Sequence, residues 1–248
     1  MLESDPILGN VIATYPSDRT RLLLPVAIII GVVAVVLNFT VAAIDAWWAP
    51  PLTVIIMSAV SLAAGWPVLH LWNREVILYD NGFSYREGGR TVYFLYHEVS
   101  SLRQRGQQLA YFGGLIRRAT FRFTLVTIRD ERMVLTNLYR NIGQMGARLE
   151  AKINPLLAPQ IDERLSKGEK VPFSDTLRFS QDGLHEDGRD LLWDSFAGYT
   201  VQGGRLRLLT RPDKSEWYSV PLGDVDNIKL LVTLLKQHET APVDNRVN

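Results

Sequence analysis

The chain has 248 residues, contains no cysteine and carries a formal net charge of +1. This length allows one large domain or two small ones, and the near-neutral charge gives no reason to expect wholesale binding to nucleic acid. Without cysteine, a disulfide, a thiolate metal site and a cysteine nucleophile are all excluded.

Two long apolar runs occupy much of the N-terminal third. Residues 22–44 and 46–72 contain no Asp, Glu, Lys or Arg, and Asp45 alone separates them. Because a helix needs about 20 apolar residues to cross the hydrocarbon core of a bilayer, each run is long enough to span it. We therefore predict a hairpin of two membrane helices, at about 22–43 and 52–72.

The charges that flank the hairpin predict its orientation. Arg19 and Arg21 precede it and Arg74 follows it, whereas the turn carries only Asp45. Because positive residues remain on the cytoplasmic side, we expect a multi-pass protein of the cell (inner or plasma) membrane with both termini in the cytoplasm. A cleaved signal peptide is disfavoured, since such peptides have a basic start and a shorter apolar core.

Small residues recur four positions apart within the two runs. The pairs are Ala27 with Gly31, Ala59 with Ala63, and Ser61 with Gly65. Such spacing lets two helix backbones approach closely in lipid. It fits packing of the hairpin against itself and, equally, an interface to another membrane subunit.

After Arg74 the sequence changes to short runs rich in Val, Tyr, Phe and Thr, which is typical of antiparallel strands and hairpins. Strands are predicted at residues 75–79, 83–86, 91–95, 119–128 and 133–136. Turn residues such as Asp80-Asn81-Gly82 lie between them. These strands are predicted to complete an antiparallel sheet.

A helical pattern follows at about residues 139–167. Its apolar stripe consists of Ile142, Met145, Leu149, Ile153, Leu156, Ile161 and Leu165. Because Pro155 and Pro159 each remove a backbone donor, we expect a kink or break near Asn154. Gly168 is the predicted end, and the helix is predicted to lie over the sheet.

The same order of elements recurs from Pro172. Further strands are predicted up to Phe179, through Trp193, at 205–210 and at 217–220, followed by a helix at 224–237. Matching positions include Asp80-Asn81-Gly82 with Gln181-Asp182-Gly183, Gly89-Arg90 with Gly188-Arg189, Tyr96-His97-Glu98-Val99 with Trp193-Asp194-Ser195-Phe196, and Asn141-Ile142 with Asn227-Ile228. Strands closed by one amphipathic helix, found twice, indicate a duplicated module.

These residues carry a family resemblance. A membrane hairpin followed by Leu78-Tyr79-Asp80-Asn81-Gly82-Phe83, Arg86, Gly88-Gly89-Arg90 and aromatic-x-Glu98-Val99 resembles bacterial membrane proteins with pleckstrin-homology-like domains. It is especially similar to a bacterial family of unknown function in which two such modules follow membrane helices and end in a strand like Val220-Pro221-Leu222. The resemblance implies an α+β soluble part of two antiparallel β modules, each closed by a C-terminal helix.

The predicted organisation therefore has five parts. They are an N-terminal cytoplasmic segment (1–20), the transmembrane hairpin (21–73), a first module with a long helix (74–168), a second and shorter module (169–239) and a flexible tail (240–248). The second module departs from a full pleckstrin-homology-like domain by its short length.

No nucleotide-binding loop, zinc signature or nucleophile elbow occurs in the sequence. The histidines are scattered, and the two acid-histidine clusters, at His97 and His185, lie at predicted strand ends or turns. We therefore predict no catalytic residue, no metal, no cofactor and no enzymatic activity.

Residues 86–122 contain seven arginines and two glutamates, a local net charge of +5. Near an anionic lipid surface each arginine contributes about 1 kcal/mol, and the apolar loop at 111–116 has the character of an interfacial insertion. The candidate lipid- or partner-binding residues are Arg103, Arg105, Arg117, Arg118, Arg122 and Phe112. The alternative is a solvated arginine-rich loop. Nucleic acid is disfavoured because lysine is scarce in this segment.

Two functions stay open. The first is a membrane-anchored, non-enzymatic binding or scaffold protein that contacts anionic membrane lipid or a protein partner, as pleckstrin-homology-like folds commonly do. The second is an accessory subunit of a larger membrane complex or transporter, which the small-residue helix faces suggest. The sequence does not specify the oligomeric state.

Overall fold

The computed structural model describes residues 5–44, 46–111 and 116–239. The chain divides into two compact units, each described separately below. The first unit is formed by Met1–Leu95 with Leu138–Ile142, and the second by Tyr96–Asn137 with Gly143–Asn248.

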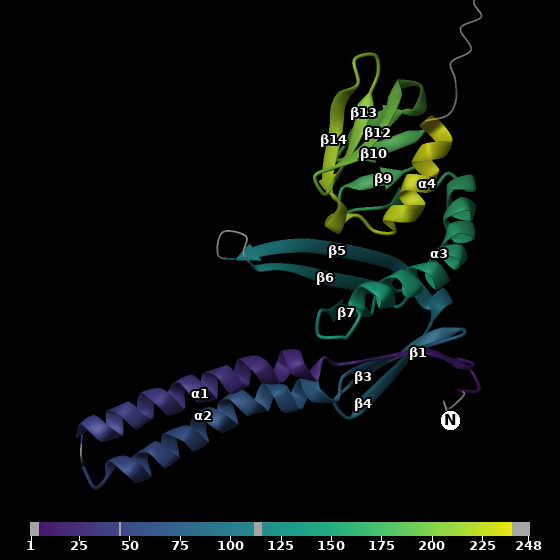
Figure 1. Ribbon diagram of the computed structural model, residues 1–248. Coiled ribbons are helices and arrows are strands. Elements are labelled where there is room, and N and C mark those ends of the chain that lie inside the picture. The colour runs from purple at the N-terminus through teal and green to yellow at the C-terminus, as the bar shows by residue number, and fades with distance from the viewer. Residues whose placement is uncertain (1–4, 45, 112–115, 240–248) are drawn as a thin grey trace, which may run out of the picture. The chain divides into compact units, whose positions relative to one another are not determined.

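Two helices, α1 (Arg19–Ile44) and α2 (Ala49–Trp72), form an antiparallel pair in the first unit (Figure 1). Both are long and apolar enough to cross a membrane, and the predicted spans fall within them. Two prolines occupy the start of α2, where a missing N–H is tolerated because the first turn has no intrahelical partner for it. The prediction of two long apolar helices is confirmed.

Large apolar side chains of α1 form one side of the seam between the helices, whereas the half-buried positions of α2 include Ser61, Ala64 and Gly65. Half-buried positions recur three or four residues apart, the spacing of a left-handed helix pair. On α1 these positions are Leu22, Val26, Ile30, Val33, Leu37 and Val41. The predicted small-residue pairs mostly lie elsewhere: the Ser61 pair is half-buried, whereas Ala27, Gly31, Ala59 and Ala63 are exposed.

A four-stranded antiparallel sheet completes the first unit. Its strands, in spatial order, are β1 (Val11–Pro16), β2 (Glu75–Tyr79), β3 (Gly82–Glu87) and β4 (Arg90–Leu95). The last three were predicted, but β1 was not, because six residues ending in proline show only a weak alternation. Although the α1–α2 hairpin separates the two strands in the sequence, β1 pairs with β2, and Tyr15 lies opposite Val76.

A second antiparallel sheet lies in the second unit, after the short 3-10 helix η1 (Tyr96–Glu98). Its strands are β5 (Val99–Tyr111), β6 (Ile116–Thr127) and β7 (Arg132–Thr136). β6 and β7 were predicted, whereas β5 was not, because its sequence is largely polar and contains Gly106. β7 pairs only with the part of β6 from Arg122 to Val126, so β5 and β6 continue as a two-stranded ribbon (Figure 1).

The helix α3 (Ile142–Ser166) continues without a break through both internal prolines, and Figure 1 shows it bending rather than running straight. Its buried hydrophobic side chains are Ile142, Met145, Leu149, Ile153, Leu157, Ile161 and Leu165. Leu157 therefore replaces the predicted Leu156, which is 41% exposed, because a four-residue spacing is maintained along the helix.

The end of α3 was predicted correctly. Gly168 adopts a left-handed φ of +75°. Its N–H donates to Leu165 O at 2.9 Å, and the N–H of Glu169 donates to Arg164 O at 3.0 Å. This pair of bonds is a Schellman motif, which satisfies the last helical carbonyls and favours glycine.

The remainder of the second unit is the second module. One sheet has the order β11 (Arg189–Leu192), β10 (Gly183–Glu186), β9 (Leu177–Phe179), β8 (Val171–Pro172), and the other has β12 (Phe196–Gln202), β13 (Arg205–Thr210), β14 (Ser215–Pro221). Two 3-10 helices, η3 (Trp193–Ser195) and η4 (Leu222–Asp224), and the helix α4 (Ile228–Glu239) complete it. β12 was not predicted, because Gly198 interrupts its pattern at a bulge.

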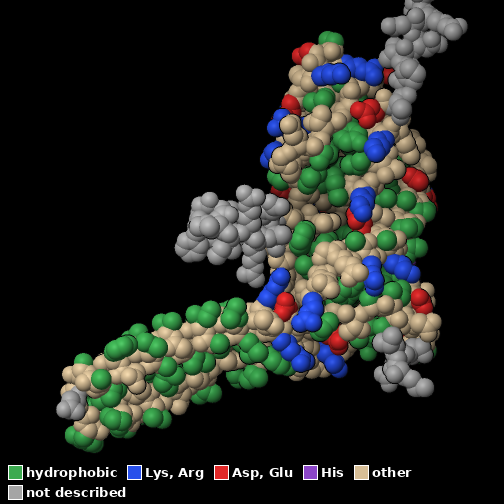
Figure 2. All heavy atoms as spheres, viewed as in Figure 1, with side chains coloured by type: hydrophobic (Ala, Val, Ile, Leu, Met, Phe, Trp, Pro, Cys, Tyr) green, Lys and Arg blue, Asp and Glu red, His purple; other side chains and the backbone are tan. Residues whose placement is uncertain are grey.

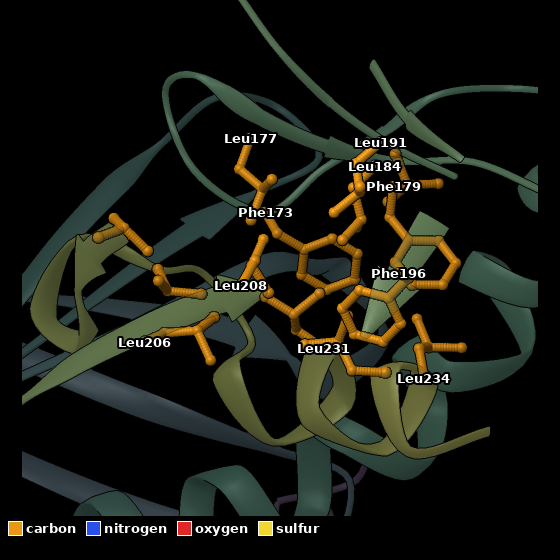
Figure 3. Close-up of a cluster of buried hydrophobic side chains, with 14 of the residues drawn as sticks. Phe173, Leu177, Phe179, Leu184, Leu191, Phe196, Leu206, Leu208, Leu231 and Leu234 are labelled. Atoms are coloured by element: carbon orange, nitrogen blue, oxygen red, sulfur yellow. The ribbon is translucent and has the colours of Figure 1, made fainter. Parts of the chain in front are cut away.

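Buried Phe and Leu side chains from both sheets and α4 form the core of this module (Figure 3). Phe179, Phe196 and Leu208 are 1% exposed or less, and Leu231 of α4 is fully buried against them. Ile161 and Leu165 of α3 belong to the same cluster. α3 therefore contributes to the hydrophobic stabilisation of the second module.

The order of elements along the chain repeats. Four strands that form one sheet, a 3-10 helix, three strands that form a second sheet, and a helix occur first as β1 to α3 and again as β8 to α4. Gly82 and Gly183 match, since a Cβ on either would lie 2.2 Å from a carbonyl oxygen of the neighbouring strand. Asn141 and Asn227 match too, each with a positive φ before its helix. The order of elements thus repeats, and the α1–α2 hairpin lies between the first two strands of the first copy.

Each compact unit combines segments that lie far apart in the sequence. The chain before the hairpin joins the first sheet through β1. The strands β5 to β7 group with the second module because the segment before α4 bonds to β5.

Candidate binding site

One face of the β5–β7 sheet is lined with arginine. The register places Arg105 opposite Arg122, Arg103 opposite Thr124 and Val126 opposite Arg132, so these side chains share a face. The alternate residues of β6 face the other way, and Phe123 there is fully buried. Strand alternation thus brings four arginines together: Arg103, Arg105, Arg122 and Arg132.

Two of the four arginines are bound to acids that lie far away in the sequence. Nε and Nη2 of Arg103 each donate to a carboxylate oxygen of Asp226 at 2.9 Å, and Nη2 also donates to Asp175 at 3.1 Å. Arg105 pairs with Asp224 at 2.7 Å. The bidentate bond to Asp226 raises the pKa of Arg103 above its ordinary value. Arg103 and Arg105 therefore hold the segment before α4 against β5.

Asn227 strengthens this attachment. Its backbone N–H donates to Leu102 O at 2.8 Å, and its side-chain oxygen accepts the N–H of Leu102 at 2.9 Å. Asn227 is 7% exposed, so both bonds are shielded from water. The edge of β5 is thus paired at this point, as it would be by a neighbouring strand.

Arg122 and Arg132 differ from the other two arginines. Both are exposed, and neither forms an ion pair with any residue that the structure describes. They line a hollow of about 100 Å³ together with Arg103, Arg105 and Asp224.

A larger cleft of about 470 Å³ shares residues with this hollow. It is lined by Ser101, Arg103, Thr124, Val126, Asp130, Arg132, Asp175 and Asp226. We call the two together the arginine groove. Arg105 and Arg122 line the smaller hollow, Asp130 and Asp175 line the larger cleft, and Arg132 lines both. Such a groove is suited to a ligand that carries charges of both signs.

The structure places only some of the sequence-predicted site residues in the arginine groove. It brings Arg103, Arg105 and Arg122 into the arginine groove. Arg117 and Arg118 lie on β6, opposite Ala110 and Leu109 of β5, but their side chains are outside the described part of the chain. Phe112 lies outside the described residues altogether.

A serine, a histidine and an aspartate form a chain of hydrogen bonds in the second module. Ser180 Oγ lies 2.8 Å from His185 Nε2, and His185 Nδ1 lies 2.5 Å from Asp190 Oδ1. This bond lowers the pKa of Asp190. Ser180 is 4% exposed, and its hydroxyl also accepts the N–H groups of Asp182 and Gly183. Since a nucleophile must reach its substrate, the arrangement instead closes the β9–β10 turn and pairs β10 with β11.

Metal-ligating side chains do not converge in the part of the chain that the structure describes. Among residues 5–44, 46–111 and 116–239, no group of three or more His, Asp or Glu side chains is placed to hold a metal ion.

A family model, described as a family of unknown function (DUF6585), matches residues 2–243. The chain belongs to the DUF6585 family. No curated protein matches it. The expectation that the chain belongs to a family of unknown function with N-terminal apolar helices is therefore confirmed, and the groove of this DUF6585 chain must be interpreted from its own geometry.

Sequence reasoning missed Arg132, Asp224 and Asp226. Arg132 lies just outside the basic segment at 86–122, and it joins the groove because β7 pairs with β6. The alternation of β7 could have placed it there, once Met133 and Leu135 were assigned to the buried face. The two aspartates gave no such signal, because they are more than a hundred residues from β5.

Proposed function

We propose that this chain is a membrane-anchored, non-enzymatic binding protein that holds a charged segment of a protein partner in the arginine groove. One observation carries the proposal: Arg122 and Arg132 are exposed without an acidic partner among the described residues, beside two arginines that are held by aspartates. A guanidinium that lacks a carboxylate partner is ready to bind one from another molecule.

The charges of the groove favour a polypeptide over an anionic lipid surface. Asp130 and Asp175 line the larger cleft and would repel lipid phosphate, whereas a segment with acidic and basic residues complements both the arginines and these carboxylates. Asp224 and Asp226 fix Arg105 and Arg103 in advance. This order reduces the conformational entropy lost on binding.

The α1–α2 hairpin supports the membrane anchor. Its helices are exposed along nearly their whole length, and Figure 2 shows hydrophobic side chains covering them. Arg19, Arg21 and Arg74 flank the hairpin and Asp45 lies in its turn, which supports a cytoplasmic location for both termini in a cell membrane.

The repeated order of elements supports a pleckstrin-homology-like fold for each module. The second module has four strands in one antiparallel sheet, three in another, and the C-terminal helix α4 packed against β12. A fold of this kind presents its strand faces and loops as binding surfaces, which agrees with the position of the arginine groove.

A peptide probe tests the proposal on the full chain in neutral detergent. The probe is a fluorescent peptide with four glutamates, a Gly-Ser spacer and two lysines, and fluorescence anisotropy reports its binding. Arg122→Glu/Arg132→Glu is expected to weaken binding about tenfold or more at low salt. The control Arg178→Glu/Arg211→Glu makes the same charge change at exposed positions outside the groove and is expected to change affinity less than about twofold.

Equal affinity of the wild type and Arg122→Glu/Arg132→Glu would overturn the proposal. Competition supplies a second outcome. If vesicles of phosphatidylglycerol displace the peptide and Arg122→Glu/Arg132→Glu abolishes vesicle binding, the groove is a lipid site and the protein-partner proposal fails.

The exposed small residues favour a second candidate function, an accessory subunit of a larger membrane complex. Ala27, Gly31, Ala59 and Ala63 lie outside the hairpin seam, and a Cβ at Gly31 would meet nothing within 4 Å. This face would allow close approach of another membrane helix. If a stoichiometric partner co-purifies with the wild type in mild detergent and is lost from Gly31→Leu, this function is supported. If the purified wild type and Gly31→Leu have the same particle mass, it is contradicted.

A further inference from the structure

Arginines gather at one end of the sheet in the first unit. The register places Pro16 opposite Glu75, Glu75 opposite Arg86, and Glu87 opposite Arg90. The end of β1, the start of β2, the end of β3 and the start of β4 therefore lie side by side. This end of the sheet continues into α1 and receives the chain from α2.

Backbone bonds bring a further arginine to the same place. The N–H of Arg140 donates to Pro16 O at 3.2 Å, and the N–H of Asp18 donates to Leu138 O at 2.7 Å. Ser17 also forms a β-bridge with Tyr139. The segment that carries Arg140 thus lies beside the start of α1, although about 120 residues separate the two in the sequence.

The first turn of α1 and the last turn of α2 lie at the same end of the helix pair. The guanidinium of Arg19 lies 4.8 Å from the ring centroid of Trp72, which joins the first turn of α1 to the last turn of α2. The hydroxyl of Ser17 donates to Trp72 O at 2.8 Å. Tryptophan is enriched at the headgroup level of membranes, so this contact marks the depth at which the apolar helices end.

Two acidic residues near this end of the sheet form ion pairs with arginines of the same unit. Arg21 pairs with Asp18 at 3.2 Å, and Arg74 pairs with Glu87. Arg86, Arg90 and Arg140 are exposed and form no ion pair with another residue in the described part of the chain. We call these three the arginine collar. Figure 2 shows basic side chains where the apolar hairpin ends.

We propose that the arginine collar binds the phosphate groups of anionic phospholipids in the bilayer that holds α1 and α2. The proposal rests on the membrane anchor and is independent of the arginine groove, which lies in the other unit. Its chemistry is the bonding of guanidinium to phosphate oxygens, in a position where lipid phosphates surround the helix ends. Each collar arginine is expected to contribute about fivefold in lipid affinity.

Native mass spectrometry of the full chain in neutral detergent, titrated with phosphatidylglycerol or phosphatidylcholine, tests the collar. The wild type is expected to retain phosphatidylglycerol in preference. Arg86→Gln/Arg90→Gln/Arg140→Gln is expected to reduce that preference by about tenfold or more, whereas the triple Arg→Lys variant retains most of it because the charge remains. Arg178→Gln/Arg211→Gln is the control, because it removes arginines at exposed positions outside both the collar and the groove.

Equal retention of both lipids by the wild type, or an undiminished preference in the Gln variant, overturns the proposal. Thermal melts of each variant without lipid show that a lost preference does not reflect unfolding. If the triple Gln variant does not fold, the single variants Arg86→Gln, Arg90→Gln and Arg140→Gln carry the test, each with an expected loss of about fivefold. Inorganic phosphate distinguishes the source of the anion. If millimolar phosphate displaces phosphatidylglycerol and stabilises the chain equally well, the collar is a site for free anions and the lipid assignment is wrong.

Discussion

The two copies of the module differ most in the connection between their first two strands. In the second copy, β8 joins β9 through a short turn in which the N–H of Phe173 donates to Leu177 O and Ser174 Oγ accepts the N–H of Leu177. In the first copy, the α1–α2 hairpin occupies the equivalent position between β1 and β2. The hairpin is therefore an insertion within a module, because the strands on either side of it still pair.

The insertion is tolerated because it returns the chain to its starting point. α1 and α2 run antiparallel, and the N–H of Ser17 donates to Arg74 O at 3.0 Å where the helices leave the sheet. The cost of closing a loop depends on the separation of its ends, which a rigid hairpin fixes in advance. β1 is also longer than β8, with six residues against two.

Replacing the hairpin by a tight turn should have the largest effect. Ser17 and Arg74 are already hydrogen-bonded, so an Asn-Gly turn in place of residues 18–73 can close a two-residue β-hairpin. We expect the shortened chain to move from the membrane fraction to the soluble fraction. Hydrogen exchange should still protect the amides of Tyr15 and Val76, and loss of that protection would contradict the view that the hairpin is an insertion.

The matched glycines offer the next test. A Cβ at Gly82 or Gly183 would lie 2.2 Å from Phe94 O or Leu191 O, and a backbone carbonyl has little room to move. Gly82→Ala and Gly183→Ala should each destabilise their unit by about 3 kcal/mol. Gly143→Ala is the control, since nothing lies within 4 Å of its Cβ position on α3. If thermal melts of the full chain show that only one of the two substitutions is destabilising, the two glycines are not equivalent.

The matched asparagines should differ in a measurable way. Asn227 is buried and its side chain accepts the N–H of Leu102, whereas Asn141 is exposed. Asn227→Gly should lower the free energy of unfolding by about 1–3 kcal/mol, because it leaves a buried N–H without its acceptor. Asn141→Gly retains the positive φ without strain and should change stability little. If chemical unfolding shows that both substitutions lower the free energy of unfolding equally, the two asparagines have a common backbone role instead.

The smallest expected effect concerns pH and is specific to the second module. His238 stacks on Trp193 with ring centroids 3.8 Å apart, and burial lowers its pKa below 6.5. The folded state prefers the neutral ring, so this contribution to stability is complete above pH 6.5 and is lost as the pH falls toward the lowered pKa. His238→Phe should flatten that part of the curve. Melts between pH 5 and 8 that show identical slopes for both chains would rule out His238 as its origin.

Strong local patterns explain what the sequence predicted well. Uninterrupted apolar runs identified α1 and α2, and Gly168 identified the end of α3 because the Schellman motif requires a left-handed residue. The turn chemistry around Gly82 and Gly183 predicted that the order of elements repeats along the chain. In each case the determining interaction lies within a few residues of the signal.

The strands that the sequence did not predict depend instead on residues that lie far away in the sequence. β1 is defined by its pairing with β2 across the hairpin, and β5 by its pairing with β6 and by Asn227. The same limit applied to the groove. The sequence suggested that Arg103 was available to a ligand, but Asp226 lies 2.9 Å away in the folded chain.

The pairing of β1 with β2 also sets the order of events during synthesis. β1 leaves the ribosome first, yet its partner follows only after the roughly 60 residues of the insertion, a delay of about 3–12 s at ordinary elongation rates. β8, by contrast, meets β9 almost at once. The first sheet can close only after both apolar helices have been made, so its completion reports that the helical pair has already been produced.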